Sequence, residues 1–203
     1  SVIAIATLAA GTPTHAQQWP TGPVTMIIPF AAGGPTDVLG RIMAERMSKA
    51  LGQQVIVENV GGAGGMTGSA RLAKAKPDGN TMQIGTVGTH AMNQTLYAKP
   101  AYDATTDFQP VALIAQLPIA LLTKKALPPT DLQSFIKYVQ DNKGKVNYAS
   151  AGTGSATHLA CVLFNSAAKI EATHVPYRGT GPAMNDVVGG QIDYICEIIS
   201  TAL

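Results

Sequence analysis

Charged and aromatic side chains are scarce in this 203-residue sequence, at 13% and 5% of all residues. No run of Lys or Arg exceeds the pair at 124–125, and the formal net charge is only +2. Proteins that bind nucleic acid need a dense patch of cations to neutralise phosphates, so we expect no nucleic-acid partner. The mild positive charge does not repel a small anion.

The sequence also lacks the motifs of several common catalytic and cofactor sites. It contains no G-x-x-x-x-G-K-[ST] phosphate loop, no H-E-x-x-H or paired-cysteine metal motif, and no G-x-S-x-G nucleophile elbow. No pair of carboxylates indicates general acid–base catalysis. We therefore expect no metal, no cofactor and no enzymatic activity. Ser155 and His158 have an alternative interpretation as nucleophile and base, although such a pair at a helix start more often caps the helix or binds a ligand.

Residues 2–10 form an uncharged apolar run that is followed by the breaker sequence Gly-Thr-Pro and then by small residues. This pattern is typical of a secretory signal, and the run is too short to cross a bilayer. We interpret residues 1–16 as the remnant of a signal peptide, with a buried strand as the alternative. The only two cysteines, Cys161 and Cys196, agree with export; they form either a disulfide between a helix and a nearby strand or a buried thiol pair.

Aliphatic residues and glycines, by contrast, are abundant: 46% of the residues are hydrophobic and 21 are glycines. Apolar runs alternate with helical patterns, which predicts parallel sheets covered by helices in an α/β protein with two βαβαβ units. The expected strands are 24–30, 54–58, 81–86, 146–150, 172–176 and 192–196, and the expected helices are 36–51, a short one ending at Ala73, 157–168 and 181–188.

Between the two units, extended aliphatic segments at 110–116 and 119–123 precede a helix that we expect Thr130 to cap. An extended stretch at this place predicts a crossover between two lobes. We therefore assign residues 17–109 to a first lobe and residues 110–203 to the crossover and a second lobe.

Two glycine-rich loops, 30–37 and 150–158, lie at equivalent strand-to-helix joints. Glycines let the backbone approach a ligand, and the amides at a helix N-terminus favour an anion. Because ligands of open parallel sheets bind beyond the carboxyl ends of the strands, the loops predict a site for a small carboxylate, held by backbone amides and by hydroxyls such as that of Thr153. The alternative is that the glycines only permit tight turns. The candidates are Phe30, Ala31, Ala32, Gly33, Gly34, Asp37, Ala151, Gly152, Gly154, Ser155, Thr157 and His158.

A third loop, 86–90, follows the last strand of the first unit and should open on the same side. Its candidate ligand-binding residues are Thr86, Gly88, Thr89 and His90, with a helix cap as the alternative role for His90. The loop 61–65 is either a further anion-binding nest or a mobile surface loop.

The sequence around these loops resembles the periplasmic receptor family of tripartite tricarboxylate transporters, also called the TctC or Bordetella uptake gene (Bug) family. The matching stretches are PFAAGGPTD at 29–37, VENVGGAGG at 57–65, KPDGNTMQIGTVGTHAMNQTLY at 76–97, NYASAGTGSATHLA at 147–160 and THVPYRGTGPAMNDVVGGQIDYICE at 173–197. The resemblance implies a two-lobed type II periplasmic-binding-protein fold in which each lobe is a mostly parallel sheet flanked by helices. It further implies a monomeric periplasmic receptor that closes on a di- or tricarboxylate or a related organic acid and delivers it to integral-membrane transporter subunits.

The same resemblance implies that the three loops line the cleft, and it adds Glu197, where the family usually has Asp. That carboxylate can meet an amino group or a water in the cleft; a capping or surface role is the alternative, because Glu is one methylene longer. The family's chain continues past Leu203 and returns to the first lobe, so we expect the C-terminal part to be missing here and residues 17–203 alone to bind weakly or fold poorly. A ligand-sensing module of a signalling system, or an α/β hydrolase or transferase, is the alternative function.

Overall fold

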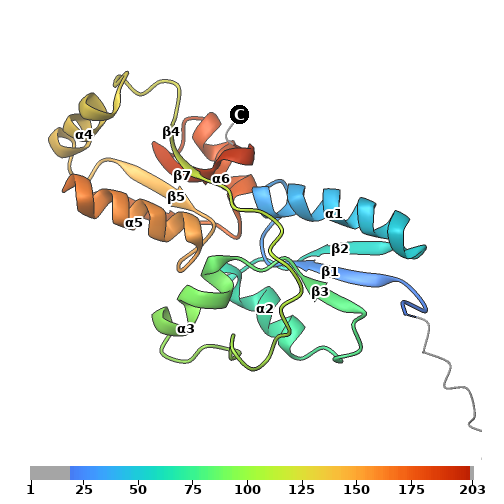
Figure 1. The fold of residues 1–203 in the computed structure, drawn as a ribbon. Coiled ribbons are helices and arrows are strands. Elements are labelled where there is room, and N and C mark those ends of the chain that lie inside the picture. Colours follow the sequence, from blue (N-terminus) through green and yellow to red (C-terminus); the bar gives the residue numbers. More distant parts are fainter. Residues whose placement is uncertain (1–18, 202–203) are drawn as a thin grey trace, which may run out of the picture.

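The structure is a computed structural model that describes residues 19–201, and it contains two sheets, each flanked by helices (Figure 1). The expected signal-peptide remnant at 1–16 lies outside these residues. Within 19–201, none of the helices combines the length and the apolar character that crossing a membrane requires.

The first sheet is parallel, with β1 (Val24–Ile28) between β2 (Val55–Asn59) and β3 (Thr81–Gln83). Helix α1 (Pro35–Leu51) contacts β1 and β2, whereas α2 (Met66–Ala73), which follows the short helix η1 (Ala63–Gly65), contacts β1 and β3. Successive residues of a strand point to opposite faces, and both faces of β1 are covered, so the strand is apolar almost throughout. The main core of this sheet consists of Val24, Met26, Ile28, Ala44, Val55 and Ile84.

The second sheet has the order β4-β7-β5-β6, with β4 (Ile119–Thr123), β5 (Asn147–Ser150), β6 (Thr173–Pro176) and β7 (Tyr194–Ile198). Strand β5 is parallel to β6 and β7, and β4 is antiparallel to β7. The flanking helices are α4 (Leu132–Asp141), α5 (Ala156–Ala168) and α6 (Thr180–Val188). The predicted α/β class with mainly parallel sheets is thus confirmed.

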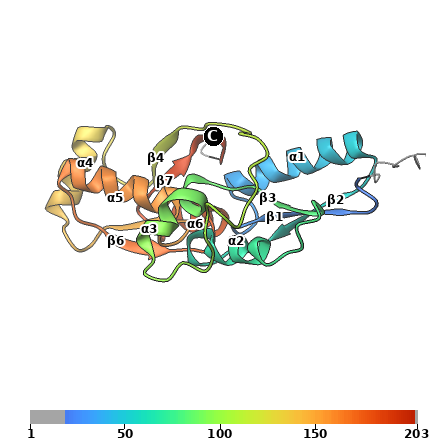
Figure 2. The same cartoon turned by 60° about the horizontal axis from the view of Figure 1, so that its bottom comes forward.

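We call β1–β3 with their helices the first lobe, and β4–β7 with theirs the second lobe. The boundary at residues 109 and 110 stays a prediction. Helices α1 and α5 both begin where the lobes meet and run outward in opposite directions (Figures 1 and 2). The N-termini of these helices are thereby brought close to one another.

Residues 110–118, which include the extended segment expected at 110–116, have no regular secondary structure, and Val111 is 93% exposed. Other local expectations were wrong. Strand β3 ends at Gln83 instead of Thr86, and the chain continues into a π-helical turn, η2 (Gly88–Met92), and α3 (Asn93–Leu96). After β7 comes the short helix η3 (Ile199–Thr201).

The cap of α4 is Asp131, not Thr130. The Asp131 carboxylate accepts a hydrogen bond from the Ser134 amide at 2.8 Å, and the Ser134 hydroxyl lies 3.2 Å from the Asp131 amide. The two residues satisfy each other's free amides in a capping box, and a carboxylate also favours the positive end of the helix dipole.

A disulfide joins Cys161 on α5 to Cys196 on β7, with a Cα–Cα distance of 5.5 Å. The predicted pairing of a helix with a nearby strand is therefore confirmed. Both cysteines are buried in the main core of the second lobe, beside Phe135, Tyr148 and Tyr194. The bond ties the helix that follows the second glycine-rich loop to the strand that carries Glu197.

We expect the double variant Cys161→Ala, Cys196→Ala to lose about 2–4 kcal/mol of unfolding free energy. The disulfide joins residues that are 35 positions apart in the sequence, and it thereby restricts the unfolded chain. Urea unfolding of the variant and of the oxidised wild type measures the difference. Two equivalents of alkylating reagent taken up by denatured, unreduced wild-type protein would contradict the bond itself.

Candidate ligand-binding site

The first glycine-rich loop carries the chain from β1 into α1. Gly34 is the N-cap of α1, and among the described residues no side chain caps this helix. The first amides of a helix have no partner within it, so those of Thr36 and Asp37 remain available to an anion. Phe30, Gly34 and Thr36 are buried, whereas Ala32 and Gly33 are exposed.

Asp37 maintains the shape of this loop. Its carboxylate accepts hydrogen bonds from the Gly33 amide at 2.9 Å, from Asn59 at 2.8 Å and from Arg41 at 3.0 Å. Burial by itself raises the pKa of Asp37, but the hydrogen bonds from Arg41, Gly33 and Asn59 outweigh it and hold the pKa below its ordinary value. The Gly33 amide is consequently engaged by its own loop.

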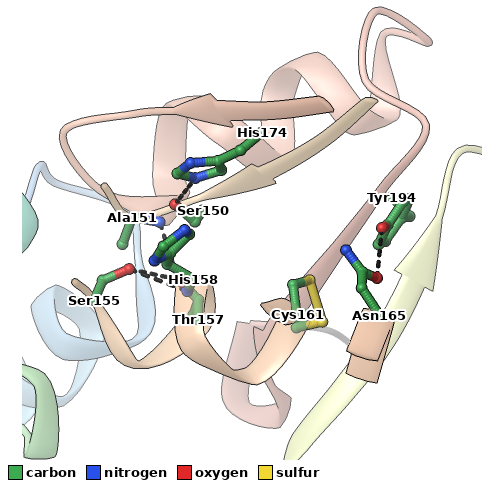
Figure 3. Close-up of a disulfide and its surroundings, with 10 residues drawn as sticks. Ser150, Ala151, Ser155, Thr157, His158, Cys161, Asn165, His174 and Tyr194 are labelled. Atoms are coloured by element: carbon green, nitrogen blue, oxygen red, sulfur yellow. Dashed lines mark hydrogen bonds between the residues drawn. A yellow bond between two sulfur atoms is a disulfide. The ribbon is translucent and has the colours of Figure 1, made fainter. Parts of the chain in front are cut away.

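The second glycine-rich loop is held by its own hydroxyls (Figure 3). Ser155 caps α5 and accepts a hydrogen bond from the His158 amide at 3.2 Å. Thr157 accepts one from the Ala151 amide at 2.9 Å, and Ser150 accepts one from the Gly152 amide at 3.1 Å. The hydroxyls therefore preorganise the loop, and of the first-turn amides of α5 those of Ala156 and Thr157 remain for a ligand.

His158 packs within the second lobe. Its Nδ1 accepts a hydrogen bond from the Gly154 amide at 3.3 Å, and its ring centroid lies 4.2 Å from that of His174 (Figure 3). Burial, with a smaller contribution from His158, lowers the pKa of His174 to about 4. Burial also lowers the pKa of His158. Both rings are thus neutral at pH 7 and add no positive charge to the site.

The third loop pairs Thr86 with Thr89, whose hydroxyl accepts a hydrogen bond from the Thr86 amide at 2.9 Å. His90 turns away into an aromatic cluster with Tyr102 and Phe108, and its Nδ1 lies 2.8 Å from the Thr89 hydroxyl. Burial lowers the pKa of His90. Of this loop, Thr86 borders the cavity described next.

A cavity of about 20 Å³ lies between the lobes. It is lined by Phe30, Gly34, Pro35, Thr36, Thr86, Ala151, Ser155, Ala156, Thr157, Thr180 and Ile198. The structure thus brings parts of all three predicted loops to one place. The other predicted residues, namely Ala31, Ala32, Gly33, Asp37, Gly88, Thr89, His90, Gly152, Gly154, His158 and Glu197, are outside this lining, and their role in binding stays a prediction.

Glycines bring the two lobes into backbone contact around this cavity. A Cβ added at Gly181 would lie 2.2 Å from the Ala32 carbonyl oxygen, and one at Gly64 would lie 2.2 Å from the Thr153 carbonyl oxygen. The Ala31 amide donates to the Arg178 carbonyl at 2.9 Å, so one predicted ligand donor is used between the lobes. Gly64 and Gly65 are buried, and Gly64 lies against the Thr153 carbonyl, so this part of 61–65 packs against the second lobe.

Three helices direct their N-termini toward the cavity. They are α1, α5 and α6, represented in the lining by Pro35 and Thr36, by Ala156 and Thr157, and by Thr180. Of the described residues, none that lines the cavity is Lys or Arg, so positive potential comes from the helix dipoles and free amides. Such an arrangement can hold an anion with carboxylate oxygens.

Thr180 was not among the predicted site residues, although a signal for it existed. The sequence Gly179-Thr180-Gly181 lies at a strand-to-helix joint of the same kind as the two glycine-rich loops. Its hydroxyl donates to Glu197 Oε1 at 3.1 Å, and the Thr201 hydroxyl donates to the same oxygen at 2.9 Å. Glu197 is fully buried, which excludes the surface role.

Within residues 19–201, no cluster of three His, Cys, Asp or Glu side chains is placed to hold a metal ion. The fold is that of a two-lobed binding protein: two mainly parallel sheets, with helix N-termini converging on a cavity between them.

Comparison with known proteins agrees with this class. The sequence profile of the tripartite tricarboxylate transporter family receptor, TctC, matches residues 39–203. A UPF0065 protein from the TAR-I ttuE-ttuC' intergenic region of Agrobacterium vitis is 41% identical over 197 residues, which are 97% of this chain and 57% of that protein. The chain belongs to the TctC family, whose members are receptors and not enzymes.

Solved structures show the same fold. The periplasmic binding protein BugD is 39% identical with a TM-score of 0.86, over 89% of this chain and 60% of that one. MatC of Rhodopseudomonas palustris with bound malate is 44% identical with a TM-score of 0.87, over 91% and 63%. R. palustris Rpa4515 with adipate is 36% identical with a TM-score of 0.87, over 91% and 62%. The chain therefore spans about three fifths of the length of these proteins.

We expect Asp37→Asn to lower the unfolding free energy by about 1–3 kcal/mol at pH 7, because the buried carboxylate accepts hydrogen bonds from three partners. The folded pKa of Asp37 is depressed, so its contribution is present above the ordinary aspartate pKa of about 4 and is lost as the pH falls through the folded pKa. Urea unfolding from pH 7 to pH 3 should show the two proteins converging in acid. A difference that is constant over this range would contradict the ionised state of Asp37.

Proposed function

We propose that the protein is a receptor that closes its two lobes on a small organic anion with at least one carboxylate. The observation that carries this proposal is the meeting of the α1, α5 and α6 N-termini around one cavity built from both lobes. Each terminus offers free amides and a partial positive charge to an anion. Because the donors come from both lobes, a bound anion favours the closed arrangement.

Two solved relatives support a dicarboxylate as the ligand class. The structures of MatC with malate and of Rpa4515 with adipate hold acids with a carboxylate at each end. Helix N-termini on both sides of the cavity suit a ligand of this kind. The loops use backbone amides instead of Lys or Arg, so they recognise the carboxylate groups more than the chain between them.

Ligand entry requires the lobes to separate. A cavity of about 20 Å³ has room for about one water molecule, which is far smaller than a dicarboxylate. The irregular segment 110–118 crosses between the lobes, and η3 contacts α1 after β7. Segment 110–118 can act as a hinge, because a few residues there absorb the change in backbone angles.

The finer proposal is that the receptor works in the periplasm and delivers its ligand to integral-membrane subunits of a tripartite transporter. It is supported by the description of the family and by the signal-like pattern in residues 1–16. Uptake of labelled malate by cells that contain the membrane subunits, with and without this protein, tests the delivery step. Equal uptake in both would contradict delivery and favour a sensing role.

We expect malate and adipate to raise the melting temperature of the purified protein by several degrees, since a ligand at 100 times its Kd adds about 2.7 kcal/mol to the folded state. The corresponding uncharged diamides are the matched controls and should have no effect, because the helix N-termini recognise charge. Equal shifts with acids and diamides would overturn the anion site.

We also expect Gly181→Ala to weaken malate binding at least tenfold. The added methyl group meets the Ala32 carbonyl oxygen of the other lobe at 2.2 Å and obstructs closure. Gly22→Ala is the control, because a Cβ at Gly22 meets nothing within 4 Å. Calorimetric titration measures both affinities, and wild-type affinity in Gly181→Ala would show that binding does not need this contact.

A further inference from the structure

The carboxyl group of Glu197 is an incompletely paired group beside the cavity. Its Oε1 accepts hydrogen bonds from the hydroxyls of Thr180 and Thr201, at 3.1 Å and 2.9 Å. Its Oε2 is buried and has no hydrogen-bond partner among residues 19–201. A buried carboxylate oxygen without a donor costs free energy, and protonation of that oxygen lowers the cost.

The cavity and Glu197 share Thr180. The Thr180 hydroxyl donates to Glu197, and the same residue lines the cavity, as does Ile198 next along β7. From the first lobe, Gly34 lies so close that a Cβ on it would be 2.9 Å from the Thr180 hydroxyl oxygen. The N-terminus of α1 therefore covers Thr180, which donates to Glu197, when the lobes are together, and separation of the lobes removes this cover.

No cation neutralises Glu197 within the described part of the chain. Most charged and titratable groups on the surrounding elements have partners of their own: Arg41 with Asp37 on α1, Tyr177 before α6 with Asp186 on α6, Lys124 with Asp193 beside β4 and β7, and His174 with Ser150 and His158 beside β5. Arg178, in the segment before α6, is exposed, whereas Glu197 is fully buried. On η3 and β4, the neighbours of Glu197 are the Thr201 hydroxyl and Ala120. Burial raises the pKa of Glu197, and the hydrogen bonds from Thr201 and Thr180 offset this only in part.

We propose that binding of an organic anion in the cavity is coupled to the uptake of one proton by Glu197. A carboxylate ligand and an ionised Glu197 are like charges on either side of Thr180, and enclosure between the lobes strengthens their repulsion. A proton taken from solvent adds to the Glu197 carboxylate, removes that repulsion and leaves a neutral acid that can donate a hydrogen bond. This inference rests on the proposed anion-binding function and adds to it a pH dependence and a specificity-determining residue.

The sign of the coupling follows from comparing the pKa of Glu197 in the free protein with its pKa in the ligand-bound protein. Ligand raises the pKa of Glu197 above its value in the free protein, so affinity falls as the pH rises between these two values, by at most tenfold per pH unit. Below the pKa of the free protein, the affinity is independent of this group. A ligand that carries a cationic group next to Glu197 would show the opposite dependence, with affinity rising as the pH rises, because the cation favours the ionised carboxylate.

Calorimetric titration with malate in buffers of different ionisation enthalpy, from pH 6 to pH 9, tests the coupling. The wild type should take up close to one proton per malate bound at the maximum. Glu197→Gln has the shape of the neutral acid but no titratable proton, so its proton count per malate bound should be near zero. Glu171→Gln, which removes an exposed carboxylate paired with Lys143, is the matched control and should keep the wild-type count.

Malate binding without proton uptake, or uptake that persists in Glu197→Gln, would overturn the coupling and leave the proposed function intact. Absence of malate and adipate binding would count against the proposed function instead.

The stability of the ligand-free protein gives a second test of the protonation of Glu197. The pKa of Glu197 is raised in the folded protein, so the stability that the protonated group contributes is lost as the pH rises through that pKa. The gain in melting temperature of Glu197→Gln over the wild type should therefore grow from pH 5 to pH 8, and a constant gain overturns the proposal.

Discussion

Backbone contact between the two lobes is the constraint on which the rest of this structure depends. Gly181 lies against the Ala32 carbonyl and Gly64 against the Thr153 carbonyl, with no room for a side chain at either glycine. Only this close approach brings the N-termini of α1, α5 and α6 to one cavity. The glycines therefore matter less as flexible turns than as flat surfaces on which the lobes meet.

The loops around the cavity are preorganised by their own polar side chains. Asp37 engages the Gly33 amide, while Ser155 and Thr157 engage the amides of His158 and Ala151. A site whose donors are already oriented loses little entropy when a ligand binds. Because the remaining donors are backbone amides, the proposed function assigns these loops recognition of negative charge and not of the identity of the acid.

Under the proposed function, specificity depends on the few side chains that differ in chemistry from their surroundings. Glu197 is the foremost of them, because it is a fully buried carboxyl group with one oxygen lacking a partner among the described residues. Its place on β7, adjacent to Cys196, is held by the disulfide to α5. The strand with this carboxyl group and the helix whose N-terminus borders the cavity are thus covalently joined.

Much of the architecture follows from the sequence by itself: the alternation of strands and helices, the mainly parallel sheets and the glycine-rich joints. These features depend on periodicity and on neighbours along the chain, whereas the choice between a disulfide and a buried thiol pair for Cys161 and Cys196 depended on the tertiary structure. The cap of α4 shows the limit, because Thr130 and Asp131 are adjacent polar residues and only the position at which the helix begins selects Asp131. Only the tertiary structure decided that 61–65 lies against the second lobe, that Thr180 joins the cavity and that His90 turns toward Phe108. Those contacts depend on how two separate sheets are placed relative to each other, and no local pattern in the sequence specifies that placement.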